Sequence, residues 1–266
     1  MVKFTDGCEV LIGDSAMVSR GKSIMYAMLA AAPMGTVPTH FYTGTKRILM
    51  MYGVGLPNRL TAMRAHRKVG GHVVLWDLGY WDRDDHMRLS IDTTHPQAYH
   101  LDLAPATGSR RDHILRDDYD PYGPIMLVGL GLKSARMYGL KPMEWERAKR
   151  AELRQRFPTR QILWRPKGRD VETMSGTVLS HGDSIEAALK GCSLVVCRHS
   201  NVGVDACIAG IPVETGDGAA AVLYRDNPVP TPEQRAEFLR RLGWWNWKTS
   251  EADAVWGLIA KTINYV

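Results

Sequence analysis

The residues best suited to chemistry follow an apolar segment in the second half of the chain. That segment, CSLVVCRHS (192–200), predicts a strand, and NVGVDACIAG directly after it predicts a helix. Ser200 and Asn201 stand at the start of this helix, where N–H groups without helical acceptors and a positive partial charge suit a phosphate. Gly203 would let a ligand approach the backbone. The same residues could equally cap an ordinary helix, and His199 could touch a phosphate or fill the strand end.

A second glycine-containing turn follows the apolar segment PIMLVGLG. Gly129 and Gly131 allow backbone N–H groups to approach a pyrophosphate, and Lys133 adds positive charge. The turn is not a Walker A loop, because the pattern G-x-x-x-x-G-K-[ST] is absent. Arg165 and Lys167 end another apolar segment, RQILWRPKG. The carboxyl ends of strands in an open α/β sheet face the ligand crevice, so these two cations could meet a phosphate there. A solvated turn is the alternative for these two cations.

Two aspartates in the first half could act as a general base. Asp77 ends the apolar segment HVVLWD, and Asp14 follows the apolar segment CEVLIG. A carboxylate held at a strand end can take the proton of an acceptor hydroxyl, although either aspartate could instead cap a helix. No metal-ligand spacing of histidines or cysteines occurs in the sequence, so no metal site and no cofactor are predicted.

The arrangement of apolar segments predicts an α/β protein with two Rossmann-like lobes. Strand-like and helix-like segments alternate in each half, which indicates parallel sheets covered by helices. The predicted strands span 8–13, 46–53, 72–79, 124–131, 160–168, 192–200 and 211–215, and the predicted helices between them include 19–32, 57–70, 183–191 and 201–210. The polar stretch 80–118 predicts surface loops. A turn cluster at 119–124 divides the chain into lobes 1–120 and 121–266, the second with terminal helices.

The positive charge is concentrated in one window of the sequence. Residues 136–169 hold eleven Lys and Arg against three Glu, and the rest of the chain is slightly acidic. Arg147, Arg150 and Arg154 lie on one predicted helix in this window and could bind a polyanion such as DNA. A solvated helix face with Glu–Arg pairs is the alternative.

The bulk composition indicates a globular protein. Hydrophobic residues make up 45% of the chain and charged residues 23%, and no apolar run is long enough to span a membrane. The first residues do not resemble a signal peptide, so a cytoplasmic location is expected, in the host cell if the protein is phage-encoded. The four cysteines form no CxxC pair, and Cys192, Cys197 and Cys207, which stand in apolar surroundings, are expected to be reduced packing residues. The tryptophans at 244, 245 and 247 are expected to pack in a core rather than stack on bases.

Two stretches carry a resemblance to known enzymes. SNVGVDACIAGIPV resembles the donor-site signature of GT-B-fold glycosyltransferases, and the resemblance places Asp205 where it helps to hold the nucleotide or sugar. MYGVGLPNRLTAMRAHRKVGGHVVLWDLGYWDR, followed by SIDTTHP, resembles the corresponding segments of capsule polysaccharide Kdo transferases. Phage DNA glycosyltransferases similarly place an aspartate after an apolar strand of their first lobe, as Asp77 stands here. The His-Pro element of the Kdo transferases is replaced by Arg165-Pro166-Lys167, which disfavours a Kdo donor.

This resemblance implies a GT-B fold with an interlobe cleft and a C-terminal helix, and an inverting, metal-independent glycosyltransferase. The expected donor is a nucleotide sugar such as a UDP-sugar. The basic window and compact chain favour a 5-hydroxymethylated pyrimidine in phage DNA as acceptor. A polysaccharide or lipid-linked glycan, as for the capsule enzymes, is the alternative acceptor, and a non-catalytic nucleotide- or nucleic-acid-binding module is the alternative class.

Overall fold

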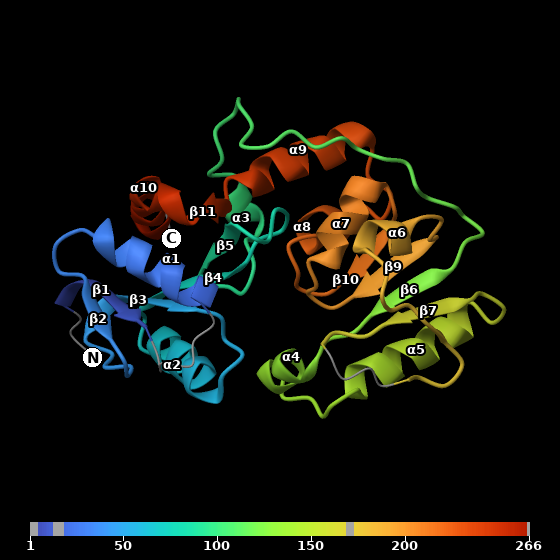
Figure 1. The fold of residues 1–266 in the computed structure, drawn as a ribbon, viewed down its shortest axis with the longest axis horizontal. Coiled ribbons are helices and arrows are strands. Elements are labelled where there is room, and N and C mark those ends of the chain that lie inside the picture. Colours follow the sequence, from blue (N-terminus) through green and yellow to red (C-terminus); the bar gives the residue numbers. More distant parts are fainter. Residues whose placement is uncertain (1–4, 13–18, 169–172, 265–266) are drawn as a thin grey trace. The chain divides into compact units, whose positions relative to one another are not determined.

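The computed structural model describes residues 5–12, 19–168 and 173–264. The chain forms two compact units, which are described separately here (Figure 1). The first comprises Met1–Arg110 together with Arg241–Val266, and the second comprises Arg111–Arg240. Each unit is an α/β structure built on its own sheet, which confirms the predicted fold class of two Rossmann-like lobes.

The sheet of the first unit has the strand order β11-β5-β4-β3-β1-β2. Its strands are β1 (Thr5–Leu11), β2 (Val37–Thr39), β3 (Lys46–Tyr52), β4 (His72–Leu78), β5 (His86–Ile91) and β11 (Asn246–Lys248). The first four are parallel, β5 is antiparallel to β4, and β11 is antiparallel to β5. The direction of progression reverses between β1 and β3, where open α/β sheets usually open a crevice at the carboxyl ends of their strands.

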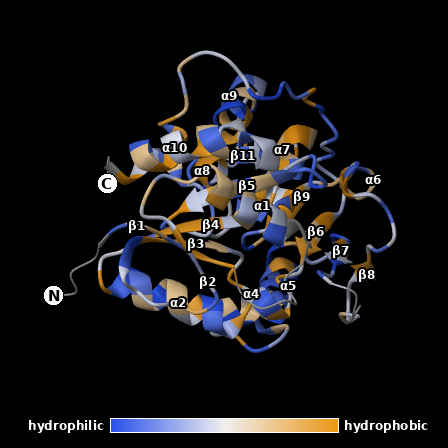
Figure 2. Cartoon of the chain, turned by 60° about the vertical axis from the view of Figure 1, so that its left-hand side comes forward, coloured by the Kyte–Doolittle hydropathy of each residue, from blue (hydrophilic) through white to orange (hydrophobic). Residues whose placement is uncertain are grey.

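Helices cover both faces of this sheet. Helices α1 (Ser19–Ala30) and α10 (Ala252–Asn264) pack together on one face and α2 (Pro57–Lys68) lies on the other, while α3 (Ala98–Leu101) follows β5. The indole Nε1 of Trp256 donates a hydrogen bond to the carbonyl oxygen of Met28 and joins the first two helices. Figure 2 shows hydrophobic residues along the central strands and hydrophilic ones on α2. Strands β3 and β4 are hydrophobic because helices cover both of their faces and bury their central residues.

The end of the chain belongs to the first unit, which differs from the division predicted at residue 120. Strand β11 and helix α10 return to the first sheet, because β11 pairs with β5 and extends the sheet by one strand. Strand β5 itself lies in the stretch 80–118 that the sequence predicted to be loops. Its apolar residues Met87, Leu89 and Ile91 are buried, and its Arg88 pairs with Asp77 of the neighbouring β4. The tryptophans Trp245 and Trp247 are buried there, which confirms that they pack in a core.

The sheet of the second unit is fully parallel and has the order β10-β9-β6-β7-β8. Its strands are β6 (Ile125–Val128), β7 (Ile162–Arg165), β8 (Val178–Leu179), β9 (Leu194–Cys197) and β10 (Val213–Thr215). The chain runs outward from β6 to β8 and then returns to the other side of β6 with β9 and β10. The order therefore reverses between β6 and β9.

The helices of the second unit connect these strands. They are α4 (Leu132–Met137), α5 (Glu144–Arg156), α6 (Ile185–Leu189), α7 (Val202–Ala209), α8 (Ala221–Tyr224) and α9 (Pro232–Gly243), the last of which leads back into the first unit. Helix α5 covers a core that includes Leu127, Ile162 and Trp164, whereas α6 and α7 pack on the opposite face. All four cysteines are free and buried, as the sequence predicted for Cys192, Cys197 and Cys207.

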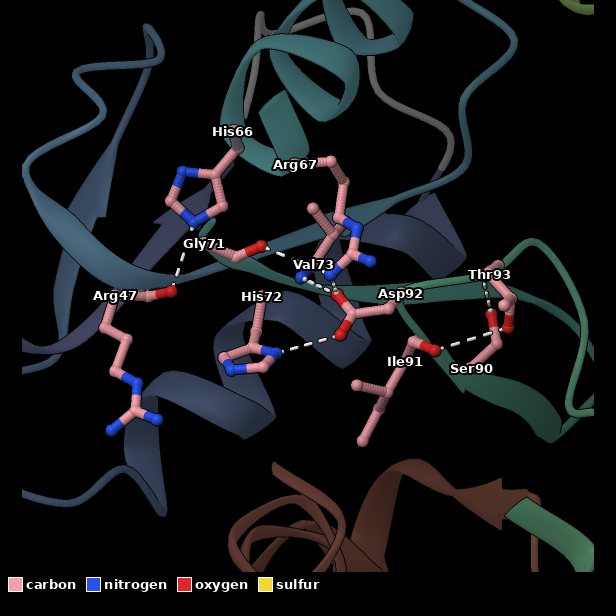
Figure 3. A network of polar contacts seen from close by, with 10 residues as sticks. All are labelled: Arg47, His66, Arg67, Gly71, His72, Val73, Ser90, Ile91, Asp92 and Thr93. Carbon is pink, nitrogen blue, oxygen red and sulfur yellow. Dashed lines mark hydrogen bonds and ion pairs between the residues drawn. The ribbon is translucent and has the colours of Figure 1, made fainter. Parts of the chain in front are cut away.

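A buried carboxylate, Asp92, joins three elements of the first unit (Figure 3). Its Oδ2 accepts a hydrogen bond from His72 Nδ1 at 2.8 Å, and its Oδ1 accepts one from the backbone N–H of Val73 at 2.8 Å. Arg67, in the last turn of α2, lies 2.7 Å from the same Oδ1. Burial opposes ionisation of Asp92, but the hydrogen bonds from His72 and Val73 and the charge of Arg67 outweigh it, so its pKa is lowered.

We expect the Asp92 cluster to make the first unit more stable above pH 4 than below it. The folded-state pKa is lowered, so the contribution is present above the unfolded-state value of about 3.9 and is lost as the pH falls through the folded-state value. Asp92→Asn should cost about 1–3 kcal/mol at pH 7, because it removes the charge but retains an oxygen for Val73.

The variant should also flatten the acid limb of a plot of unfolding free energy against pH, measured by urea titration. Asn suits this position because Asp92 has a φ of 60°, a left-handed conformation that Asn tolerates. The exposed Asp253→Asn serves as the matched control and should leave the acid limb unchanged. An identical pH profile in Asp92→Asn and wild type would contradict the assignment.

Candidate functional site

Three loops of the second unit meet at the carboxyl edge of its sheet. They follow β6, β7 and β9, which are adjacent strands, and they contain most of the predicted donor-site residues. The loops after β6 and β9 flank the point where the strand order reverses. Ligands of open α/β sheets bind at this position, because the connections diverge there and leave a crevice. The topology therefore brings together two sequence segments that lie about 70 residues apart.

The loop after β6 depends on its glycines. A side chain at Gly129 would place its Cβ 2.8 Å from the Trp164 ring and 3.1 Å from the backbone nitrogen of Lys167. Gly131 has φ 76° and ψ 157°, a conformation essentially confined to glycine. The stem of Lys167 lies next to Gly131, since a Cβ there would be 3.4–3.5 Å from its methylene carbons. Both predicted glycines are thus required by close packing and by backbone conformation.

A buried glutamate that the sequence did not single out supports this loop. Glu146 on α5 is 2% exposed, and its Oε1 accepts a hydrogen bond of 2.8 Å from the backbone N–H of Leu130. Leu130 itself is buried between the two glycines. The sequence did contain a signal for Glu146. It stands seven residues before Leu153, and this spacing places the two side chains on the same inner face of an otherwise basic helix.

The loop after β9 is bound to the elements on either side of it. The imidazole Nε2 of His199 lies 3.1 Å from the hydroxyl of Ser134 on α4, so the predicted His199 connects the β9 and β6 loops. The Arg198 guanidinium stacks 3.8 Å from the centre of the Tyr138 ring. Burial, with Asp217 nearby, raises the pKa of the Tyr138 phenol. Ser134, Tyr138 and Arg198 are therefore site residues that sequence reasoning did not assign.

The start of α7 is closed by its own loop. The Ser200 hydroxyl accepts a hydrogen bond from Val202 N, and the carbonyl oxygen of Ser200 accepts one from Gly203 N at 3.1 Å. Asn201 accepts from Asp205 N through its carbonyl oxygen. Gly203 is buried, and a Cβ there would lie 3.0 Å from the side chain of Ala220, so packing alone explains this glycine. The first N–H groups of α7 are engaged locally, which leaves phosphate binding to side chains.

The predicted cations of the β6 and β7 loops differ in their surroundings. Arg165 donates hydrogen bonds to the Ser180 hydroxyl at 3.3 Å and the Asp183 carbonyl oxygen at 2.8 Å, and so fixes the segment after β8. Lys133 and Lys167 are exposed. These two lysines are thus the cations best placed to meet an anionic ligand at the edge of the sheet.

The basic helix α5 uses much of its charge within the unit. Arg150 donates a hydrogen bond to the carbonyl oxygen of Ser175, and Arg154 donates to those of Pro158, Arg160 and Gly176. Arg147 is exposed. Lys149 and Arg156 both pair with Glu152 and with Glu214 of the edge strand β10, at 2.7–3.2 Å. Two of the three predicted polyanion-binding arginines therefore hold loops of their own unit.

A polar pocket of about 370 Å³ opens next to the β9 loop. Its walls come from α5 and from the residues at and after the ends of β9 and β10, and include Trp145, Lys149, Arg198, Glu214, Thr215 and Asp217. The residues after β10 are bound to the β9 loop, because Thr215 Oγ1 and the backbone N–H groups of Gly216 and Asp217 all donate to the Arg198 carbonyl oxygen at 2.9–3.0 Å. The pocket and the β9 loop form one continuous site.

In the first unit, Asp77 lies near the carboxyl end of β4, as predicted. Its side chain is 36% exposed, and its Oδ2 accepts a hydrogen bond of 2.8 Å from the largely buried Arg88. Its Oδ1 accepts from Leu78 N at 2.8 Å. These bonds fix the carboxylate while leaving part of it accessible to solvent. Asp14, the rival candidate, lies outside the described residues.

The described part of the chain has neither a cluster of metal-ligating side chains nor a membrane-spanning helix. Within residues 5–12, 19–168 and 173–264, no group of three or more His, Cys, Asp or Glu side chains is arranged to hold a metal ion. In the same part of the chain, no helix has the length and apolar character needed to cross a bilayer.

Comparison with solved structures identifies the class of fold. The chain is similar to KpsC of Thermosulfurimonas dismutans, a β-Kdo 2,4 transferase, with 11% identity and a TM-score of 0.54 over 95% of this chain and 97% of that one. It is also similar to the β-Kdo 2,7 transferase of the same KpsC, with 12% identity and a TM-score of 0.51 over 96% and 99% of the two chains. No protein-family model and no curated protein sequence matches the chain.

The fold is therefore one that glycosyltransferases have, and it extends over nearly the whole chain. The predicted similarity to Kdo transferases is supported at the level of fold. At 11–12% identity it fixes the architecture but not the substrates.

We expect Glu146 to stabilise the second unit through the β6 loop. Replacing it by Ala leaves the buried N–H of Leu130 without its acceptor and should cost about 1–3 kcal/mol in unfolding free energy. Glu146→Gln should cost less, because the amide oxygen can still accept this bond. Chemical denaturation of both variants, with the exposed Glu186→Gln as control, measures the difference. Equal losses in the Ala and Gln variants would show that the hydrogen bond to Leu130 is not the source of the stabilisation.

Proposed function

We propose that this protein is a glycosyltransferase of GT-B type that takes its sugar from a nucleotide-sugar donor bound by the second unit. The observation that carries the proposal is the meeting of the β6 glycine loop and the β9 loop at the reversal of strand order. The similarity of fold to two glycosyltransferase structures over at least 95% of the chain supports it.

In this proposal the donor diphosphate lies along the β6, β7 and β9 loops. Lys133 and Lys167 offset its negative charge, and Ser200 and Asn201 offer polar groups beside it. Basic side chains aimed at the leaving group can stabilise the charge that develops there, so the reaction needs no metal in this scheme. Asp205 would contact the nucleotide or sugar, as the resemblance implies.

We further propose that Asp77 is the general base of an inverting displacement. The acceptor hydroxyl oxygen forms a bond to the anomeric carbon while the bond from that carbon to the phosphate oxygen breaks. The hydroxyl proton passes to Asp77, and the electron pair of the broken bond leaves with the nucleotide diphosphate. Arg88 acts as a positioning residue, because its hydrogen bond fixes the orientation of the Asp77 carboxylate.

For the acceptor, we propose a hydroxyl of a glycan. The sequence favoured a hydroxymethylated base in DNA because of the basic window and the compact chain, but Arg150 and Arg154 of that window bind carbonyl oxygens of their own unit. Incubation with hydroxymethylated DNA or with oligosaccharides, followed by mass spectrometry, separates the two acceptors. A protein that consumes no donor with any acceptor would instead be a binding module.

We expect the two exposed lysines to control donor affinity. Lys133→Ala and Lys167→Ala should each weaken binding of UDP or of the preferred nucleotide about tenfold, since each removes one charge-assisted contact to the diphosphate. Titration calorimetry with the free nucleotide measures this directly. Lys190→Ala, an exposed lysine after α6, is the matched control and should bind normally. Unchanged affinity in both test variants would place the diphosphate elsewhere.

We expect Asp77→Asn to lower the transfer rate about 10²–10⁴-fold while leaving nucleotide affinity unchanged, because the base acts on the acceptor and not on the donor. Asp84→Asn, an exposed aspartate after the same strand, should keep the wild-type rate. A melting curve must accompany the variant, since Asp77 also pairs with Arg88. Full rate in Asp77→Asn together with an inactive Asp14→Asn would transfer the role to Asp14.

A further inference from the structure

The pocket beside the β9 loop has a lining whose charges cancel. Lys149 Nζ lies 3.2 Å from Glu214 Oε1, and Arg198 Nε lies 3.9 Å from Asp217 Oδ1. Two cations and two anions therefore face the pocket of about 370 Å³. Such a lining offers no net attraction to an anion, in contrast to the exposed Lys133 and Lys167 of the neighbouring loops. The diphosphate and the occupant of this pocket must differ in charge.

The chemical groups of the lining suit a polyhydroxylated ring. Each sugar hydroxyl can donate one hydrogen bond and accept others, and the pocket presents both kinds of partner. Glu214 and Asp217 accept hydrogen bonds, whereas Lys149 and Arg198 donate them. Trp145 contributes an aromatic side chain to the wall, and an aromatic surface packs well against the C–H face of a sugar ring.

The pocket is also in the right place for the transferred sugar. Its residues Thr215, Gly216 and Asp217 are bound to the carbonyl oxygen of Arg198, which begins the β9 loop. A donor whose diphosphate lies on that loop would have its next group, the sugar, within reach of the pocket. The space is sufficient for a sugar ring but small for an entire nucleotide sugar.

We propose that this pocket holds the sugar of the donor and that this sugar is uncharged. The inference rests on the proposed glycosyltransferase function and adds the class of sugar to it. A carboxylated sugar would bring a third anion beside Glu214 and Asp217, and the cations Lys149 and Arg198 of the pocket lining already face these acids. The expected donor thus differs from that of the structurally similar transferases, whose sugar, Kdo, is a sugar acid.

The test compares donors whose sugars differ in charge, with UDP-glucose and UDP-glucuronic acid as the pair that shares its nucleotide. Wild-type protein is incubated with UDP-glucose and with UDP-glucuronic acid. GDP-mannose and ADP-glucose, whose sugars are uncharged, and activated Kdo, whose sugar is acidic, are tested alongside them. Donor consumption is measured in each case. A neutral donor should be used with at least a tenfold higher kcat/KM than any acidic one. Preference for UDP-glucuronic acid or activated Kdo would overturn the inference and leave the proposed function standing.

Asp217→Asn tests the pocket itself. Its side chain is 44% exposed, so the substitution should fold normally, which a melting curve checks. It should lower kcat/KM for the preferred neutral donor about tenfold, because a carboxylate acceptor is lost, and should narrow the preference against the acidic donor. Affinity for UDP, or for the free nucleotide of the preferred donor, should stay within twofold of wild type. Glu186→Gln, an exposed acid on α6, is the control and should behave as wild type.

The remaining outcomes separate the two proposals. Equal losses of affinity for donor and free nucleotide in Asp217→Asn would assign the pocket to the nucleoside, and an unchanged kcat/KM would remove the pocket from the donor site. Either result overturns the inference alone. If wild-type protein consumes no donor and binds no free nucleotide, the proposed function fails and the inference fails with it.

Discussion

The parallel pairing of β6 with β9 is the constraint on which the second unit depends. Residues 125–127 of β6 align with 194–196 of β9, so the two strands end at the same edge. Because the chain first builds outward from β6 and then returns to its other side, the connections on the two sides diverge at this pair. The candidate donor-site residues that follow β6 and β9 are placed by this arrangement, and so is Ser134 of α4, which lies next to His199.

Charge in this protein divides into groups that hold the fold and groups that face solvent. The carboxylates of Glu146 under the glycine loop and of Asp92 in the first unit are buried and accept hydrogen bonds from backbone N–H groups, so they fix loops and strand ends. Arg150 and Arg154 hold loops in the same way. Lys133 and Lys167 remain exposed at the edge of the sheet. A high net positive charge is thus a poor guide to a polyanion surface, because hydrogen bonding within the unit uses many of the cations.

The proposed chemistry follows from a separation of these roles. The segments after β6 and β7 present the exposed Lys133 and Lys167, whereas the pocket beside the β9 loop presents paired acids and cations. A nucleotide sugar has the same division, with a charged diphosphate and a sugar that is held by hydrogen bonds. In the first unit, Arg88 pairs with the Asp77 carboxylate and fixes it, so the orientation of this carboxylate is set before any substrate binds.

The sequence by itself determined the elements and the glycine turns. Continuous apolar segments predicted the strands β1, β3, β4, β6, β7, β9 and β10, because strands buried on both faces are apolar throughout. The helices α2 and α7 were also predicted. The strands β2, β5, β8 and β11 were missed. Strand β5 carries Arg88 among its buried residues, and that cation is tolerated only because Asp77 lies opposite it on β4. Strand β11 joins the first sheet through pairing with a segment about 160 residues earlier, which no local pattern reveals.

Only the tertiary structure decided which polar residues share a site. The motif around Ser200 and Gly203 and the glycine turn before Ser134 were visible in the sequence, but Tyr138 and Asp217 come from segments that have no motif of their own. The roles of Arg150 and Arg154 were likewise decided by loops that fold back against α5. Hydrogen bonding and ion pairing depend on distances of about 3 Å across the chain, and spacing along the sequence does not contain that information.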